Sequence, residues 1–281
     1  MPELPELEVI REVLARRVVG QTLQAVKVLP PGGLIVVRDL THTGFESALT
    51  GRTIAGITRR GKFLIFTFRP GLPLPGLFLV INTKLSGRLQ LAAPPDKRLA
   101  KTRLLFTFSE QLQLRYVDQK QMGQVYLTPT LESIPDYGSL GPEPFDLPLE
   151  QFRERLKSRH GEIKGILTRG DFVAGIGNAY ADEILWAARL HPYRKRNQMT
   201  AEEVERLYTA MQYTLSAAIE KVRQGMQENI HLEPRSFMAV HMKAGQPCPR
   251  CGNRISLVGA NQRITNFCRT CQPGGFIKGM E

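Results

Sequence analysis

The sequence contains no long apolar run. Hydrophobic residues make up 42% of the 281 positions, which is enough to build cores and excludes a disordered chain. No stretch approaches the ~20 consecutive apolar residues that a membrane-spanning helix needs, and the most apolar run, Leu77–Ile81, is only as long as a strand. The opening Met-Pro-Glu-Leu-Pro-Glu lacks the basic start and apolar centre of a secretion signal. We therefore expect a soluble, cytoplasmic protein without membrane contacts, built of two domains at about 150 residues per domain.

Acidic residues are in the minority. The 26 Asp and Glu residues are outnumbered by 38 Lys and Arg residues, which gives a formal net charge of +12 and an isoelectric point near 9.8. A soluble protein this basic usually meets a polyanion, and nucleic acid is the leading candidate. A basic protein without a nucleic-acid partner is the alternative that charge alone leaves open.

Cysteine is absent from the first 247 residues. Cys248, Cys251, Cys268 and Cys271 form two C-x2-C pairs separated by sixteen residues. Each pair can present two thiolates to one metal ion, and the spacer is long enough for a β-hairpin that brings the pairs together. Two disulfides are the alternative, but disulfides are rare in a reducing compartment. The spacing therefore favours one structural Zn²⁺ bound by all four cysteines.

Periodicity divides the chain into a β-rich part and a helical part. Apolar residues spaced by three and four predict a helix over Pro5–Val19, ended by Gly20. Segments rich in β-branched and aromatic residues then predict a β-sandwich capped by this helix, at Thr22–Val28, Thr53–Arg59, Lys62–Phe68, Leu77–Ile81, Gly87–Leu91, Arg103–Phe108, Gln111–Val117 and Gln124–Leu127. Helical patterns follow at Leu149–Arg159, Glu162–Leu167, Asn178–Ala188 and Ala201–Gln224.

The predicted class is therefore α+β. We expect an N-terminal β-sandwich domain at 1–128 that carries catalysis and a proline-rich linker at 129–148. A helical DNA-binding domain at 149–235 and a zinc-finger β-hairpin at 236–281 complete the predicted organisation.

A glycine-rich turn precedes one of the predicted helices. The run Gly175–Glu183 places two glycines before a helix for which Asn178 is a good N-cap. The free N–H groups of such a helix start suit a DNA phosphate. Together with the short helix over 163–167 it forms a helix–turn–helix-like unit. An ordinary helix start is the alternative.

The first residues could form a nucleophilic site. Pro2 permits removal of Met1, which would leave a secondary amine at the new N-terminus. An α-amino group has a pKa near 8, so part of it is neutral at physiological pH and could attack an electrophilic sugar carbon to give an iminium. Glu3 and Glu6 are close enough in sequence for one to transfer protons and the other to hold the terminus. The alternative is that these glutamates only complement the helix dipole.

These features together resemble one family. The Pro2–Glu6 opening, the Arg60-Gly61-Lys62 turn, the Gly175–Glu183 run and the cysteine hairpin occur in this order in formamidopyrimidine-DNA glycosylases (Fpg/MutM, with the related Nei enzymes). The sequence resembles that family over essentially its whole length, and Leu4 favours the Fpg branch.

The resemblance implies a bifunctional DNA glycosylase/AP lyase of base excision repair. Such an enzyme removes 8-oxoguanine and formamidopyrimidines from double-stranded DNA and then cleaves the strand by β,δ-elimination. It also implies a helix–two-turn–helix domain. Because a single active site that binds a single duplex needs no symmetry, we expect a monomer. We expect it to be associated with the bacterial nucleoid.

The resemblance also implies a role for individual residues. Pro2 would be the nucleophile at C1′ and form the Schiff base, Glu3 the general acid/base, and Glu6 the residue that orients the site. Lys62 would bind phosphate and assist elimination, and Arg263 would grip the phosphates beside the lesion. DNA contacts are expected from the helical unit, at Asn178 and Lys164.

The residues that fill the gap left by a flipped base differ from the family pattern. Leu85 stands at the first wedge position, Met122 replaces an aromatic wedge, and Lys120 replaces the arginine that reads the opposite base. A lysine cannot reproduce the two-pronged hydrogen bonding of arginine, and the stretch Gly225–Pro247, which includes the family's loop over the flipped base, is shorter. An Nei-like preference for oxidised pyrimidines is therefore one alternative, and a non-catalytic protein that binds damaged DNA is another.

Overall fold

The computed structural model describes residues 1–70, 76–259 and 264–274, and the chain divides into two compact units. Unit 1 comprises residues 1–138 and 221–234, and unit 2 comprises residues 139–220 and 235–281. The long helix α7 (Ala201–Met226) contributes its last residues, from Lys221 onward, to unit 1.

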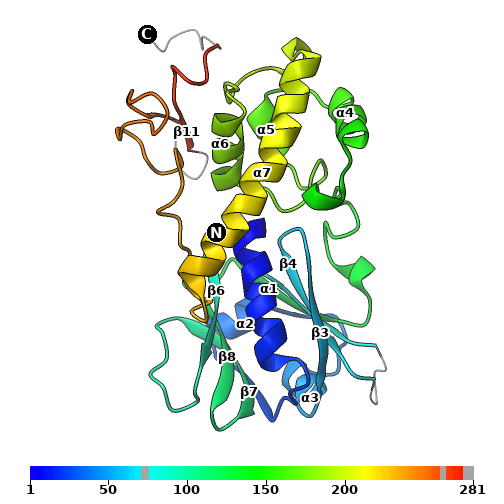
Figure 1. Ribbon diagram of the computed structural model, residues 1–281. Coiled ribbons are helices and arrows are strands. Elements are labelled where there is room, and N and C mark those ends of the chain that lie inside the picture. Colours follow the sequence, from blue (N-terminus) through cyan, green and yellow to red (C-terminus); the bar gives the residue numbers. More distant parts are fainter. Residues whose placement is uncertain (71–75, 260–263, 275–281) are drawn as a thin grey trace. The chain divides into compact units, whose positions relative to one another are not determined.

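The described residues of unit 1 form two β-sheets (Figure 1). One sheet is antiparallel, with the order β1-β7-β8-β6: β1 (Ala25–Val28), β6 (Gly87–Ala92), β7 (Thr102–Ser109) and β8 (Leu112–Asp118). The other has the order β2-β9-β5-β4-β3: β2 (Val37–Asp39), β3 (Ile54–Arg60), β4 (Phe63–Phe68), β5 (Phe78–Asn82) and β9 (Gln124–Thr128). Only its β2–β9 pair is parallel. The eight strands that the sequence predicts are thus confirmed to within a few residues.

Helix α1 (Leu4–Val18) covers the opening between these sheets and confirms the predicted N-terminal helix (Figure 1). It begins here because Pro5 suits the first helical turn, and its apolar side chains at helical spacing are buried. The chain then leaves the helix, and Gly20 takes a positive φ of 83° that favours glycine. The three-residue strand β2 and the short helices α2 (Gly32–Val36) and α3 (Phe45–Leu49) were not predicted from the sequence.

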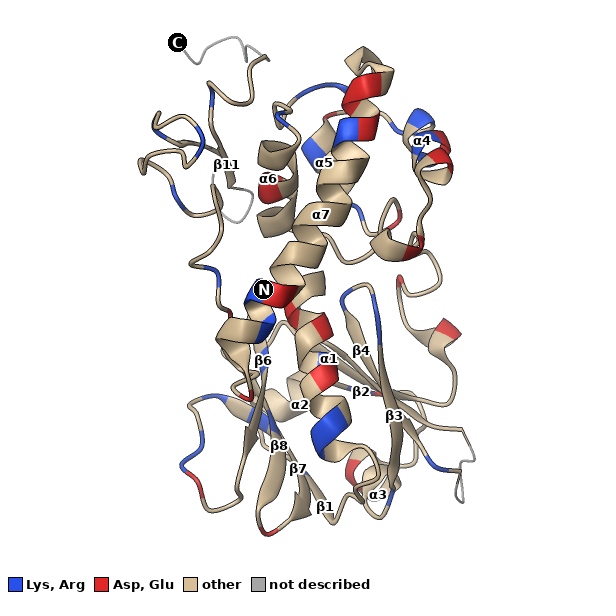
Figure 2. Ribbon diagram, viewed as in Figure 1, with Lys and Arg blue, Asp and Glu red and all other residues tan. Residues whose placement is uncertain are grey.

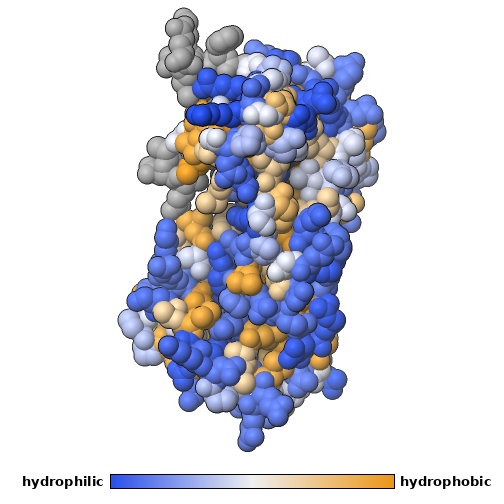
Figure 3. Space-filling model, turned by 60° about the vertical axis from the view of Figure 1, so that its left-hand side comes forward, coloured by the Kyte–Doolittle hydropathy of each residue, from blue (hydrophilic) through white to orange (hydrophobic). Residues whose placement is uncertain are grey.

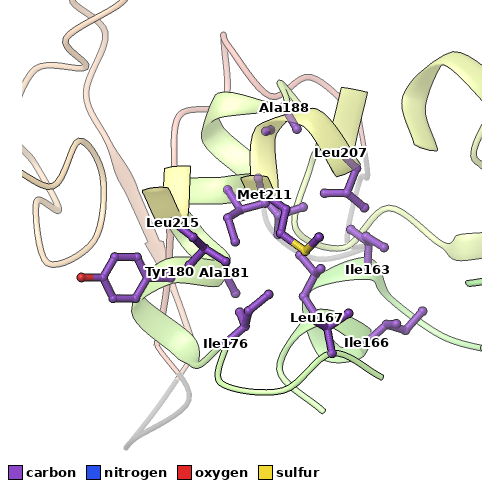
Figure 4. Close-up of a cluster of buried hydrophobic side chains, with 14 of the residues drawn as sticks. Ile163, Ile166, Leu167, Ile176, Tyr180, Ala181, Ala188, Leu207, Met211 and Leu215 are labelled. Atoms are coloured by element: carbon purple, nitrogen blue, oxygen red, sulfur yellow. The ribbon is translucent and has the colours of Figure 1, made fainter. Parts of the chain in front are cut away.

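Unit 2 is mainly helical, as the sequence predicts. Its helices α4, α5 and α6 pack with α7 around one apolar cluster, and Figure 4 shows Ile163, Leu167, Met211 and Leu215 gathered in it. The bounds are Leu149–Lys157 for α4, Ile163–Leu167 for α5 and Asn178–Ala187 for α6. The short strands β10 (Ser256–Val258) and β11 (Thr265–Phe267) pair antiparallel and form the predicted hairpin near the C-terminus. The proline-rich stretch before α4 carries the 3₁₀ turns η1 (Leu131–Ser133) and η2 (Pro144–Asp146), and a third, η3 (Arg196–Gln198), precedes α7.

Apolar side chains do not gather on one large surface in the view of Figure 3, where orange residues form small groups among hydrophilic ones. Within the part of the chain that the structure describes, none of the helices has both the length and the apolar character needed to cross a membrane.

Candidate functional site

The start of α1 brings two acidic side chains next to Pro2. Glu3 and Glu6 form a capping box, in which the backbone N–H of Glu3 donates to Glu6 Oε2 at 2.9 Å. Both carboxyl groups are buried, at 2% exposure for Glu3 and 0% for Glu6. Buried carboxyl groups are costly unless they are hydrogen-bonded. This pair therefore marks the N-terminus as a site at which acid/base groups are held in a fixed geometry.

The turn that carries Lys62 is held against the same helix. Gly61 and Lys62 connect β3 to β4, and Gly61 has the positive φ, 56°, that the first position of a type II′ hairpin turn requires. The guanidinium of Arg59 donates to Glu8 Oε2 at 2.7 Å and to the Gly61 carbonyl at 3.0 Å. Burial opposes the ionisation of Glu8, but hydrogen bonds from Arg59 and Arg11 outweigh it and lower its pKa. A partly buried ion pair thus joins α1 to the hairpin that carries Lys62.

The predicted wedge residues lie on two turns of unit 1. Leu85 is in the turn over residues 83–86, which we call the first wedge turn, and it is half-buried. Lys120 and Met122 are in the turn over residues 119–123, the second wedge turn, and both are exposed. Met122 is 45% exposed.

Asp118 ties the two wedge turns together. Its fully buried carboxylate accepts backbone N–H bonds from Lys120, Gln121 and Gly123 at 3.2, 3.0 and 2.8 Å. It also accepts a hydrogen bond from the hydroxyl of Ser86, in the first wedge turn. One carboxylate therefore fixes the backbone from which both wedge side chains project.

A buried tyrosine completes this arrangement. The Tyr116 hydroxyl donates to Asp118 Oδ2 at 3.3 Å, and burial together with the nearby Asp118 charge raises the pKa of Tyr116 far above its usual value. A Cβ at Gly123 would lie 1.6 Å from this hydroxyl, and a Cβ at Gly87 would lie 2.4 Å from it. Only glycine fits at these two positions.

In unit 2, the turn before α6 differs from the sequence prediction in one detail. Gly177, not Asn178, is the N-cap of α6, and Asn178 is the first helical residue. The amide of Asn178 donates to the Ile264 carbonyl at 2.7 Å, just before β11. Asn178 thus connects α6 with the hairpin strand, and its contact with a DNA phosphate stays a prediction.

Lys164 lies inside unit 2. Its ammonium is 2.6 Å from Asp182 Oδ1 and donates to the Ile264 carbonyl and the Thr265 hydroxyl at 3.0 and 2.8 Å. The residue is 7% exposed. A DNA contact would require this ammonium to leave a buried carboxylate, so the contacts favour an internal role that joins α5, α6 and β11.

The four cysteines lie together, with their sulfur atoms all within 4.8 Å of one another. The Sγ–Sγ distances are 3.8 Å for Cys248–Cys271 and 3.5 Å for Cys251–Cys268. Tetrahedral zinc with Zn–S bonds of about 2.3 Å requires sulfur atoms about 3.8 Å apart, so the four sulfurs fit one Zn²⁺. Burial opposes the ionisation of Cys248, but backbone N–H groups and the Trp186 indole, 3.4 Å away, lower its pKa to about 6.

Comparison with known proteins agrees with this geometry. Residues 1–125 match the model of the formamidopyrimidine-DNA glycosylase N-terminal domain, residues 140–229 that of its H2TH domain, and residues 245–274 that of the zinc finger found in FPG and IleRS. The formamidopyrimidine-DNA glycosylase of Symbiobacterium thermophilum is 36% identical over 97% of this chain and 90% of its own length. The chain belongs to the formamidopyrimidine-DNA glycosylase family.

Solved structures of this family share the fold. A Lactococcus lactis Fpg mutant, in complex with DNA that contains Fapy-dG, superposes with a TM-score of 0.83 at 32% identity over 97% of this chain and all of that one. The wild-type Lactococcus lactis Fpg in complex with DNA that contains an oxidised pyrimidine gives 0.83 at 33% identity with the same coverage. The protein is therefore a DNA glycosylase of DNA repair, and its four cysteines hold one structural zinc.

Membership of the Fpg family explains the charge of the C-terminal region. Residues 235–274 contain six Lys or Arg residues and no Asp or Glu, and Figure 2 shows several of these basic residues in the loops beside β11. Arg263, the residue expected to grip phosphates, lies outside the described residues. A basic region without acidic residues favours contact with phosphates.

Three buried acidic residues that hold loops in place, Asp118, Asp182 and Glu183, were not predicted from the sequence. Glu183 is buried, and its carboxylate accepts the backbone N–H groups of Ala239, Val240 and His241, each at 2.8 Å. Burial raises the pKa of Glu183 even though these bonds act in the opposite direction. Asp118 could have been suspected, because an Asp that opens a turn often accepts the N–H two residues on. Nothing local in the sequence indicates the partners of Asp182 and Glu183.

Proposed function

We propose that this glycosylase is bifunctional: it removes an oxidised purine through a Schiff base at Pro2 and then cleaves the strand as an AP lyase. The carrying observation is the buried pair Glu3 and Glu6, in a capping box directly after Pro2, in a chain of this family. The capping box fixes the first turn of α1, and it therefore also fixes the position of the Pro2 nitrogen, which directly precedes this turn.

The chemistry starts when Met1 has been removed. The secondary amine of Pro2 attacks C1′ of the damaged nucleotide, and the C1′–N bond to the base breaks, with Glu3 as the proton donor and acceptor. The nitrogen loses its proton and the sugar ring opens, which gives an iminium between Pro2 and C1′. Loss of a proton from C2′ and of the 3′-phosphate completes β-elimination, and a second elimination releases the 5′-phosphate.

DNA binding supports these steps. Because a sugar carbon cannot be reached inside the stack, the nucleotide must be flipped out of the duplex. Leu85 and Met122, on the two wedge turns, would fill the gap, with Lys120 facing the opposite base. Lys62, Asn178 and Arg263 would bind phosphates. We expect the protein to act as a monomer. Because its substrate is chromosomal DNA, it would be located at the bacterial nucleoid, in the cytoplasm.

Borohydride reduction tests the Schiff base. We expect the wild-type protein to be trapped covalently on duplexes that contain 8-oxoguanine or an abasic site, and its intact mass to lack Met1. Pro2→Gly and Glu3→Gln should lose most base excision, whereas Glu12→Gln, on the same helix but paired with Arg223, should keep it. Absence of an adduct on both substrates, or a retained Met1, contradicts the proposal. Salt-sensitive binding without cleavage would indicate a binding protein instead.

Lesion choice needs a separate comparison. The Lactococcus lactis protein has been crystallised with DNA that contains an oxidised pyrimidine, so a preference for pyrimidines is the second candidate. Parallel excision of 8-oxoguanine and dihydrothymine distinguishes the two. We expect faster excision of 8-oxoguanine, and a faster reaction on dihydrothymine would reassign the substrate class.

A further inference from the structure

Glu233 approaches the N-terminus in unit 1. The amine of Met1 lies 3.3 Å from Glu233 Oε1 and 3.4 Å from Oε2. The guanidinium of Arg88, in β6 directly after the first wedge turn, lies 3.0 Å from Glu233 Oε1. The Glu233 side chain is 16% exposed. A carboxylate that follows α7 is therefore held beside the first two residues of the chain and beside the first wedge turn.

The position of Met1 shows where a sugar bound to Pro2 would lie. The carbonyl carbon of Met1 is a trigonal carbon bonded to the Pro2 nitrogen. In the iminium of the proposed reaction, C1′ is a trigonal carbon bonded to the same nitrogen. The Met1 Cα then stands for C2′, and the Met1 amine stands for a substituent of C2′. Glu233 therefore lies about 3.3 Å from the place of a C2′ substituent.

The carboxylate is also able to accept a proton there. Glu233 Oε1 is buried, and among the described residues no hydrogen bond ends on it, although two cations lie nearby. The contact with Arg88 orients the group without occupying it by a hydrogen bond. A buried carboxylate oxygen that accepts no hydrogen bond is uncommon in folded proteins and needs an explanation.

We propose that Glu233 is a catalytic residue of the lyase step: it removes the C2′ proton from the iminium. The inference rests on the Schiff base at Pro2 proposed above. The C2′–H bond breaks, its electron pair forms the C1′–C2′ double bond of an enamine, and the proton bonds to Glu233. The enamine then re-forms the iminium as the C3′–O bond breaks, and the 3′-phosphate leaves with that electron pair. Glu233 returns its proton to water.

Single-turnover reactions with abasic-site DNA separate this step from the formation of the iminium. In Glu233→Gln we expect borohydride-trapped adduct to form at the wild-type rate within about twofold. Its conversion to cleaved strand should be slower by about 10²-fold, as for the loss of a general base. Glu228→Gln is the matched control, because Glu228 is in the same segment but pairs with Arg16 and Arg17 on the surface. It should behave as wild type.

Deuterium at C2′ identifies the slowed step. Conversion of the adduct by Glu233→Gln should show a primary isotope effect at least as large as that of wild type. Unchanged conversion, equal losses in formation and conversion, or slow conversion without an isotope effect would each overturn the role of Glu233. A wild type that is never trapped would instead refute the Schiff base itself. If Glu233→Gln does not fold, Glu233→Asp carries the same test, because it moves the carboxylate by one methylene.

Discussion

An Asp118→Asn substitution replaces one oxygen of the carboxylate that fixes the second wedge turn. Oδ1 accepts the Lys120 and Gln121 N–H groups and the Ser86 hydroxyl, while Oδ2 accepts the Gly123 N–H and the Tyr116 hydroxyl. Neither orientation of an asparagine amide satisfies both sets of donors. The less costly one points the NH₂ group at Tyr116, whose hydroxyl can accept, and leaves the Gly123 N–H facing another donor.

The hydrogen bonds that are lost or weakened set the size of the effect. One orphaned buried N–H costs about 1–3 kcal/mol, and the weaker bonds to a neutral acceptor cost about 1 kcal/mol more. We expect Asp118→Asn to lower the free energy of unfolding of unit 1 by about 2–4 kcal/mol, measured by urea denaturation. Hydrogen exchange should also speed up at the amides of residues 120–123.

A matched control separates this effect from a general loss of charge. Asp96 is exposed, and its carboxylate accepts the backbone N–H of Ala93 at 2.8 Å. Asp96→Asn should therefore change the free energy of unfolding by less than about 0.5 kcal/mol. If Asp118→Asn is as stable as Asp96→Asn and its 120–123 amides exchange at the wild-type rate, Asp118 does not hold the wedge turns.

Two further perturbations test the zinc site and the hairpin that carries Lys62. Removal of zinc by a chelator, or Cys268→Ser, should unfold the small cluster around the cysteines, because few other buried side chains support it. The fluorescence of Trp186, the only tryptophan, should report this through its contact with Cys248, and an unchanged spectrum would contradict it. Since the pKa of Glu8 is lowered from 4.5, its ion pair stabilises the fold above pH 4.5 and this contribution is lost as the pH falls through the lowered value. The free energy of unfolding of Glu8→Gln should therefore fall less steeply with decreasing pH than that of wild type. Equal slopes would refute the contribution of the ion pair.

Local patterns predicted most of the fold. Alternation and turn residues located the strands of unit 1, and helical spacing located the helices of unit 2, because each segment buries a face that its own period defines. Strand β2 has only three residues, Val37–Asp39, and three residues cannot show a period. The linker was predicted from proline content, which does not reveal its 3₁₀ turns.

The candidate site was predictable only in part. The spacing of the cysteines identified the metal centre, since two pairs on a hairpin suffice to define it. The burial of Lys164 was not predictable, because its partner Asp182 is eighteen residues away and a basic sequence offers no reason to expect a buried lysine. Glu233 was missed for the same reason: its contact with Met1 joins the two ends of unit 1's sequence.

Helix α6 carries two neighbouring acidic residues that attach the C-terminal region within unit 2. Glu183 binds the backbone of residues 239–241, and Asp182 binds the Asn266 amide and the His241 ring. Each residue of a helix is rotated by about 100° from the one before it. Inserting or deleting one residue in α6 ahead of Asp182 would swing both carboxylates away from their partners, so these contacts constrain the number of residues in the first turn of this helix.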